Sequence, residues 1–401
     1  HPVMGHYLSM FKNRKPDAAA NIRPDENYAR EIMQLFSIGL VQLGPDGVPA
    51  TQGGAPIPAY GQDQIRGLAH VFTGWNWANC PRTDGGQWWE WEWCPPGPEA
   101  NPGAGWLLPM QEWEQYHAVD GSKTLLNYPG VTLPGGVLPA GGTARGNLET
   151  ALDNVFRHPN VGPFLARRLI QRLVSSNPSP AYVARVAAVF ANNGQGVRGD
   201  LRATVRAILM DTEARTLPTL ASNRGKLREP LLRQTQLWRV LNAYADNGRY
   251  QEWNAEFNYG QAALRAPTVF NFFLPDFRPT GELSALGLDA PEFQITTDPQ
   301  LASSATALGA RTYWAWRGNE WQTDEDVVVD LQPFQPLAVA SPTALVDRFD
   351  LLLMNRTMSQ PMFDILVNHI ASLDPSKDQG RERVMDTVWL IQTSPEYVIE
   401  R

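Results

Sequence analysis

The first side chains that could do chemistry together lie within residues 24–40. Asn27 and Glu31 are four residues apart, so a helix would place both on one face. Glu31 could act as a general acid or base or as a metal ligand, and Arg30 could hold an anionic group. Two interpretations stay open: a polar seam at a site, or a structural face with a Glu26–Arg30 ion pair.

A second group of polar residues follows in residues 117–123. His117 and Asp120 are candidate catalytic residues, and Lys123 could bind a ligand or balance charge. Together with Trp75, which follows Thr73-Gly74, and with the 24–40 segment, they would form the site of an extracellular hydrolase. The sequence contains no known nucleophile, zinc-protease, phosphate-loop or dinucleotide motif. No metal site is predicted, and the cofactor, if any, is unknown.

Two helices would have to position these residues. Residues 24–40 begin with a proline that suits a first helical position, end at Gly39, and carry apolar residues at spacings of three and four. That stripe consists of Tyr28, Ile32, Leu35 and Phe36. Residues 62–73 show the same pattern, with Ile65, Leu68, Ala69 and Phe72. We therefore expect two amphipathic helices ahead of Trp75.

Residues 76–146 have no helical periodicity and are rich in Trp, Gly and Pro. Read as an extended segment, residues 88–93 place Trp89, Trp91 and Trp93 on one face. These rings could form a platform for sugar rings, or they could form a local core or a protein interface. A Pro-Gly-Gly turn within 131–137 predicts a short hairpin.

Cys80 and Cys94 are the only cysteines and flank the Trp-rich run. Two nearby cysteines in such a loop predict a disulfide and hence an oxidising compartment, with two separate thiols as the alternative. A bridge over thirteen intervening residues would contribute about 3 kcal/mol.

From residue 147 the pattern is densely helical, and residues 256–273 are expected to form a helix kinked at Pro267. The predicted fold class is mainly α: a multi-helical globular array with a long irregular Trp/Gly/Pro-rich insertion and one short β-hairpin. The predicted domains are a helical segment 1–75, an insertion 76–146, and a region 147–401 that packs with 1–75 as one large domain.

Composition excludes several classes of protein. The chain has 401 residues, 43% hydrophobic residues and a net charge of −7, which is typical of a globular protein without a basic field for nucleic acid. No window approaches eighteen apolar residues, so no membrane span is predicted. The start at His1, without a Met, is typical of a processed product or a fragment.

Several motifs together resemble the bacterial domain-of-unknown-function 1800 family. The first is Asp25-Glu26-Asn27-Tyr28-Ala29-Arg30-Glu31, and the second ends in Phe72-Thr73-Gly74-Trp75. The resemblance continues through His158-Pro159, Phe164-Leu165-Ala166-Arg167-Arg168-Leu169, Lys226-Leu227-Arg228-Glu229-Pro230 and Ser394-Pro395-Glu396-Tyr397. Two features differ: the family usually has His next to Asp or Glu, whereas His117 and Asp120 are separated, and its N-terminal helical section is missing before His1.

The resemblance implies a largely helical, secreted protein, often encoded beside a sulfatase-like partner, and no activity is established for the family as a class. We therefore expect a secreted, periplasmic or cell-surface protein that acts by binding or assembly. Its partner would be another protein, such as its own missing N-terminal section or the sulfatase-like protein, or a polysaccharide. The hydrolase around Glu31 remains the alternative, and whether the protein is an enzyme stays open.

Overall fold

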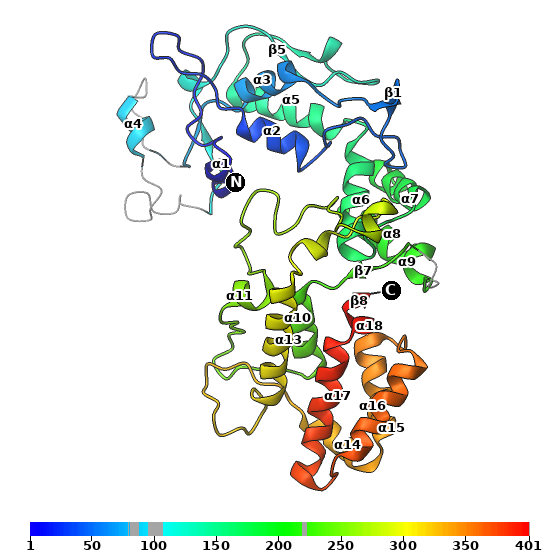
Figure 1. The fold of residues 1–401 in the computed structure, drawn as a ribbon. Helices are drawn as coiled ribbons and strands as arrows, with labels where there is room; N and C mark the ends of the chain where they lie inside the picture. The colour runs from blue at the N-terminus through cyan, green and yellow to red at the C-terminus, as the bar shows by residue number, and fades with distance from the viewer. Residues whose placement is uncertain (79, 81–87, 95–106, 219–222, 401) are drawn as a thin grey trace. The chain divides into compact units, whose positions relative to one another are not determined.

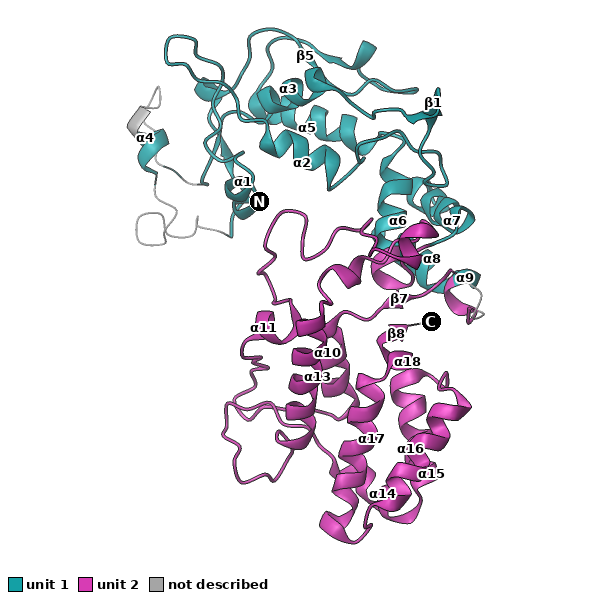
Figure 2. Ribbon diagram, viewed as in Figure 1, with its two compact units in different colours: residues 1–170, 178–213 teal, residues 171–177, 214–401 magenta. Residues whose placement is uncertain are grey.

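The structure is a computed structural model that describes residues 1–78, 80, 88–94, 107–218 and 223–400. The chain divides into two compact units (Figure 2). Unit 1 comprises residues 1–170 and 178–213, and unit 2 comprises residues 171–177 and 214–401. The predicted segments 1–75 and 76–146 thus both belong to unit 1, whereas 147–401 is shared between the two units.

Helices dominate both units, and the predicted mainly α class is confirmed (Figure 1). In chain order, the elements up to residue 215 are α1 (Pro2–Tyr7), α2 (Asn27–Gln34), β1 (Thr51–Gln52), β2 (Ala55–Pro56), α3 (Gln62–Val71), β3 (Trp75–Asn76), α4 (Trp88–Trp93), β4 (Gln111–Glu112), β5 (Lys123–Thr124), β6 (Val137–Leu138), α5 (Ala144–Phe156), α6 (Val161–Leu173), α7 (Pro180–Ala191), α8 (Leu201–Met210) and α9 (Thr212–Arg215).

The elements of unit 2 follow from residue 226. They are β7 (Lys226–Leu227), α10 (Pro230–Val240), α11 (Ala255–Tyr259), α12 (Glu282–Ala285), α13 (Asp298–Tyr313), α14 (Gln335–Ala340), α15 (Pro342–Phe349), α16 (Gln360–Ser372), α17 (Arg381–Thr393), α18 (Pro395–Val398) and β8 (Ile399–Glu400). Among the described residues every sheet is a two-stranded antiparallel pair: β1–β2, β3–β4, β5–β6 and β7–β8.

The core of unit 1 forms where α3 packs against α2, α5 and β5. Ile65, Leu68 and Phe72 of α3 are buried, as the spacing predicts. Gly67 faces β5 so closely that a Cβ atom there would overlap the carbonyl oxygen of Thr124. The contact between this helix and this strand therefore requires glycine at position 67.

The core of unit 2 surrounds α17, which packs against α13, α14, α15, α16 and α18. Val384, Val388 and Ile391 of α17 are completely buried in it. Helices α13 and α17 lie side by side in this bundle (Figure 1). Such a bundle is a rigid support for a site on its surface.

Helix α2 is shorter than expected. It begins at Asn27 rather than next to Pro24, and it ends at Gln34 rather than at Gly39. Its buried residues are Ala29, Glu31 and Met33, and Tyr28 and Ile32 pack partly buried against the core. Phe36, predicted to lie in the buried stripe, is exposed because it follows the end of the helix.

Three other local predictions are wrong. Residues 88–93 form helix α4 rather than an extended segment. The hairpin pairs β5 with β6, and the Pro-Gly-Gly sequence forms a helical turn just before β6 rather than the hairpin's own turn. The predicted helix 256–273 stops at Tyr259, because Gly260 takes a positive φ of 66° that ends α11.

Candidate functional site

Helix α2 presents its charged residues to α3. Arg30 donates to Glu26 at 2.6 Å, as predicted, and also to Gln62 of α3 at 3.2 Å. Gln62 in turn donates to both carboxylate oxygens of Glu26 at 2.9 Å. The side chains of Arg30 and Glu26 thus tie the two helices together, and Asn27 is exposed at the start of α2.

Glu31 of the same helix is 9% exposed and takes no part in these contacts with α3. Its Oε2 is buried and has no hydrogen-bond partner in the described part of the chain. Burial raises the pKa of Glu31, while Arg30 opposes this effect. The charge of Glu31 also contributes to the rise in the pKa of Tyr60 to about 12, which is due mainly to burial. Burial of a carboxyl group disfavours its charged form.

His117 is completely buried and held at both ring nitrogens. Asn147 Nδ2 lies 2.9 Å from His117 Nε2 and also donates to the carbonyl of Gly141, so Nε2 must be the acceptor. Nδ1 then carries the proton and donates to the carbonyl of Thr73 at 3.0 Å. Burial lowers the pKa of His117, and the charge of Lys123 lowers it further. This neutral imidazole ties the Thr73-Gly74-Trp75 corner to α5.

Lys123 lies on β5 and is 2% exposed. Its Nζ has no hydrogen-bond partner among the described residues. Burial lowers the pKa of Lys123, whereas the exposed Asp120 opposes this shift. Lys123 also lowers the pKa of His70 in α3. His117, Asp120 and Lys123 are therefore linked through the charge of Lys123.

Glu31 does not belong to that group. Within the described ranges, no hydrogen bond, ion pair or electrostatic interaction joins Glu31 to His117, Asp120 or Lys123. His70 of α3 nevertheless lies within electrostatic reach of both sets, because Lys123 adds to the lowering of its pKa by burial and Glu26 opposes it. The two pockets described below are lined by other residues, all of them in unit 2.

The Trp-rich segment forms a small core of its own. Cys80 and Cys94 form the predicted disulfide, with Cα atoms 5.7 Å apart. Trp91 is completely buried beside it, 4.4 Å from the ring of Tyr116 and 5.7 Å from that of Trp113. A ring enclosed in this way has no free face for a sugar.

The other tryptophans predicted to bind a ligand differ from one another. Trp93 is exposed at the end of α4, whereas Trp75 is buried and is covered by the guanidinium of Arg145 at 5.4 Å. The side chain of Trp89 lies outside the described residues. The expectation of three aligned rings fails because α4 is helical, and positions two apart on a helix do not share a face.

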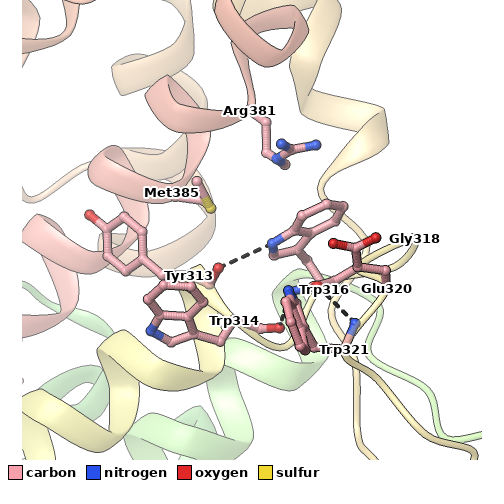
Figure 3. A pocket seen from close by; sticks show the side chains of 9 residues that line it. Tyr313, Trp314, Trp316, Gly318, Glu320, Trp321, Arg381 and Met385 are labelled. Atoms are coloured by element: carbon pink, nitrogen blue, oxygen red, sulfur yellow. Dashed lines mark hydrogen bonds between the residues drawn. The ribbon is translucent and has the colours of Figure 1, made fainter.

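Unit 2 contains the aromatic site that the sequence-based reasoning missed. A pocket of about 680 Å³ lies where α13 ends, and we call it the aromatic pocket (Figure 3). Its main lining residues are Tyr313, Trp314, Trp316, Glu320, Trp321, Arg381 and Met385. This volume falls within the roughly 300–1,000 Å³ typical of small-ligand sites.

Local hydrogen bonds hold the tryptophans of this pocket in place. Asn319 donates to the carbonyl of Trp314 at 2.7 Å and accepts from the backbone N–H of Trp321 at 3.2 Å. Gln322 donates to the same carbonyl at 2.6 Å. The indole N–H of Trp316 donates to the carbonyl of Tyr313 at 3.1 Å (Figure 3). These bonds hold the backbone at Trp314 and Trp321 and the indole ring of Trp316.

The wall of the aromatic pocket is anchored to the bundle by Tyr313. Its hydroxyl donates to Asp386 at 2.6 Å, and Asp386 also contacts His369 at 2.7 Å. Burial and the hydrogen bond to Asp386 raise the pKa of Tyr313. Despite this support, Trp314 is 67% exposed and Trp321 79% exposed. Two exposed indoles beside a pocket favour a ligand-binding surface over a core.

The fold and its pocket define a mainly α, two-unit protein with a disulfide-linked insertion and an aromatic pocket on unit 2. Among the described residues, no helix is long and apolar enough to cross a membrane. The family model described as "Protein of unknown function (DUF1800)" matches residues 1–399, so the chain belongs to that family. No curated protein and no solved structure matches the chain.

Proposed function

We propose that this protein is secreted and binds a polysaccharide through the aromatic pocket of unit 2. The observation that carries the proposal is the pair of exposed indoles, Trp314 and Trp321, which line a pocket of about 680 Å³ together with Trp316. Sugar rings present flat C–H faces that pack on indole rings, and hydroxyl groups at their edges need polar partners. Glu320 and Arg381 supply these partners in the same pocket.

The disulfide supports the location that this function requires. Cys80–Cys94 would persist in an oxidising compartment such as the periplasm or the extracellular space. Polysaccharides of the cell envelope and its surroundings are found there. The predicted platform of Trp89, Trp91 and Trp93 is replaced in this proposal by the aromatic pocket, because Trp91 is enclosed.

Native gel electrophoresis through gels that contain single polysaccharides tests the proposal. The wild-type protein should be retarded by at least one polysaccharide of a broad panel. Changing Trp314 and Trp321 to Ala should weaken binding about 10-fold or more for each residue, since a central aromatic contact contributes about 2 kcal/mol. Trp253→Ala is the matched control, because Trp253 is 62% exposed on the same unit but does not line the pocket. Retardation that survives the loss of both indoles would overturn the proposal.

A second function, hydrolysis of an extracellular polymer, has one observation in its favour. Glu31 is a buried carboxyl group with a raised pKa and an unpartnered oxygen, which suits a general acid. The assay is release of reducing ends from the polysaccharide that binds. Activity that Glu31→Gln abolishes without loss of binding would support this second function, and the absence of new reducing ends would remove it.

A further inference from the structure

A second pocket adjoins the aromatic pocket and shares two of its residues. It measures about 260 Å³, and Trp316 and Arg381 line both pockets. The remaining lining is mainly polar, so we call it the polar pocket: Arg317, Gln332, Gln335, Asp378 and Gln379, with Leu331 as its apolar member. The two pockets are therefore neighbours with different chemistry.

Two guanidinium groups, those of Arg317 and Arg381, line the polar pocket. Arg381 contacts Asp378 at 3.2 Å, and its Nε is buried without a hydrogen-bond partner in the described structure. Arg317 packs over the ring of Tyr244 at 5.5 Å and forms no ion pair with any described residue. A guanidinium group presents five N–H donors in a planar fork that matches a carboxylate. Two such groups thus face one small space.

The balance of charge differs between the two pockets. The charged residues that line the aromatic pocket are Arg381 and Glu320, whose formal charges cancel. The polar pocket is lined by Arg317, Arg381 and Asp378, which leave a net formal charge of +1. An anionic group would therefore be favoured in the polar pocket, while an uncharged ring face would be favoured over the indoles.

The backbone that carries Asp378 is fixed in an unusual conformation. Asp378 and Gln379 have φ angles of 52° and 56°, and Gly380 follows with 79°. Gln335 donates to the carbonyl of Asp378 at 3.0 Å, which holds this turn against α14. Left-handed residues other than glycine are maintained at a cost, and they are common at ligand clamps.

We propose that the polysaccharide is acidic, with sugar rings that carry carboxylates. One ring would pack on the indoles of the aromatic pocket, and the carboxylate would be held by Arg317 and Arg381 in the polar pocket. This inference rests on the proposed function, because it assigns the chemical class of the same ligand.

Isothermal titration calorimetry with short oligouronates tests this assignment. The panel contains oligomers of galacturonate, glucuronate and mannuronate, each beside its methyl ester, which keeps the ring and removes the charge. At least one acid should bind the wild-type protein 10-fold or more tightly than its ester does. Added salt should lower the affinity for the acid and leave the affinity for the ester unchanged. Dextran sulfate serves as a polyanion of different chemistry.

Three variants sharpen the result. Arg317→Met should reduce the affinity for the acid about 10-fold and leave the affinity for the ester unchanged. Arg249 is exposed and lines neither pocket, so Arg249→Met should leave both affinities unchanged. Asp378→Asn should strengthen binding of the acid, because it removes the competing carboxylate, and asparagine tolerates the left-handed backbone.

The outcomes separate the two proposals. Equal binding of acid and ester, with both lost in Trp314→Ala/Trp321→Ala, would overturn the acidic class and leave polysaccharide binding standing. Dextran sulfate bound as tightly as the acid would also overturn it, since the pocket would then accept any polyanion. Failure of the acids, the esters and the neutral polysaccharides alike would remove the proposed function itself.

Discussion

The guanidinium of Arg381 lies 3.8 Å from the ring centroid of Trp316. Both side chains line the aromatic pocket and the polar pocket, so this stacked pair forms the boundary between them. On the polar side Arg381 also contacts Asp378 at 3.2 Å. One contact thus links the apolar and the charged parts of the candidate ligand site.

The buried lysines of the two units should respond oppositely to the same substitution. Lys226 lies 3.3 Å from Glu292, and both side chains are almost completely buried. Lys226→Met would leave the Glu292 carboxylate unpaired and should lower the free energy of unfolding by about 3–5 kcal/mol. Lys123→Met removes a buried amine that has no hydrogen-bond partner among the described residues, so it should be neutral or stabilising.

Denaturant unfolding of the two lysine variants at neutral pH measures both effects. A large loss of stability in Lys123→Met would contradict the description of Lys123 as a buried group without a structural partner. In that case a partner of Lys123 would have to be sought.

Glycine at position 67 should be irreplaceable, unlike another helical glycine. Gly67→Ala drives a methyl group into the carbonyl of Thr124 and should destabilise unit 1 by about 1–3 kcal/mol or more. Gly162→Ala in α6 meets the carbonyl of Ala187 at an ordinary 3.4 Å, so helix propensity should dominate and stability should rise by up to about 1 kcal/mol. Thermal unfolding of the two variants gives the comparison, and similar melting temperatures would contradict the close approach of α3 to β5.

Acid should destabilise the protein through its buried histidines. Burial lowers the pKa of His158 from 6.5 to about 4, and Arg198 adds to this shift. Below pH 6.5 the unfolded chain therefore binds the proton more readily, and stability falls as the pH drops from about 6.5 to about 4. His158 should account for up to about 3 kcal/mol of that loss.

His158→Asn isolates this contribution. His158 Nδ1 accepts from the N–H of Asn160 at 3.1 Å, and an asparagine oxygen can take over that role without titrating. The variant should lose less stability than the wild type between pH 6.5 and 4, as followed by denaturant unfolding at each pH. Parallel curves for the two proteins would assign the acid sensitivity to other groups, such as His70 and His117, whose pKa values are also lowered.

Loss of the disulfide should affect stability and leave the pocket of unit 2 intact. Cys80→Ala/Cys94→Ala opens a loop with a sequence separation of 14 and should lower stability by about 3 kcal/mol. Trp91 would lose its fixed surroundings, so the near-ultraviolet circular dichroism should weaken. Polysaccharide retardation should be unchanged, and its loss would place the ligand on the insertion rather than on unit 2.

Much of the fold could be predicted from local patterns. The spacing of Ile65, Leu68 and Phe72 predicts the buried face of α3, because an amphipathic helix has one solution for its apolar side. The Glu26–Arg30 ion pair and the Cys80–Cys94 disulfide could also be predicted, because each joins two residues that are close in sequence. The alternating tryptophans of residues 88–93 led to the wrong prediction of an extended segment. A run of six residues is too short to distinguish a strand from a helix.

The candidate site depends on contacts that a single sequence does not display. Trp316 and Arg381 are far apart in the chain, and α13 and α17 must pack before they meet. The local signal was nevertheless present, because Tyr313, Trp314, Trp316 and Trp321 are four aromatic residues in one short stretch. That signal does not predict a pocket by itself, because the segment after α13 has no periodicity that would place its rings on one face.

The most direct test of the central claim is nuclear magnetic resonance of the indole N–H groups. The chain has 14 tryptophans, so ¹⁵N-tryptophan labelling gives one reporter for each, assigned by single Trp→Phe variants. Titration with the best-binding oligouronate should shift the signals of Trp314, Trp316 and Trp321 and leave those of Trp75 and Trp91 unchanged. Shifts confined to tryptophans outside the aromatic pocket, or binding that moves none of these three signals, would contradict the account.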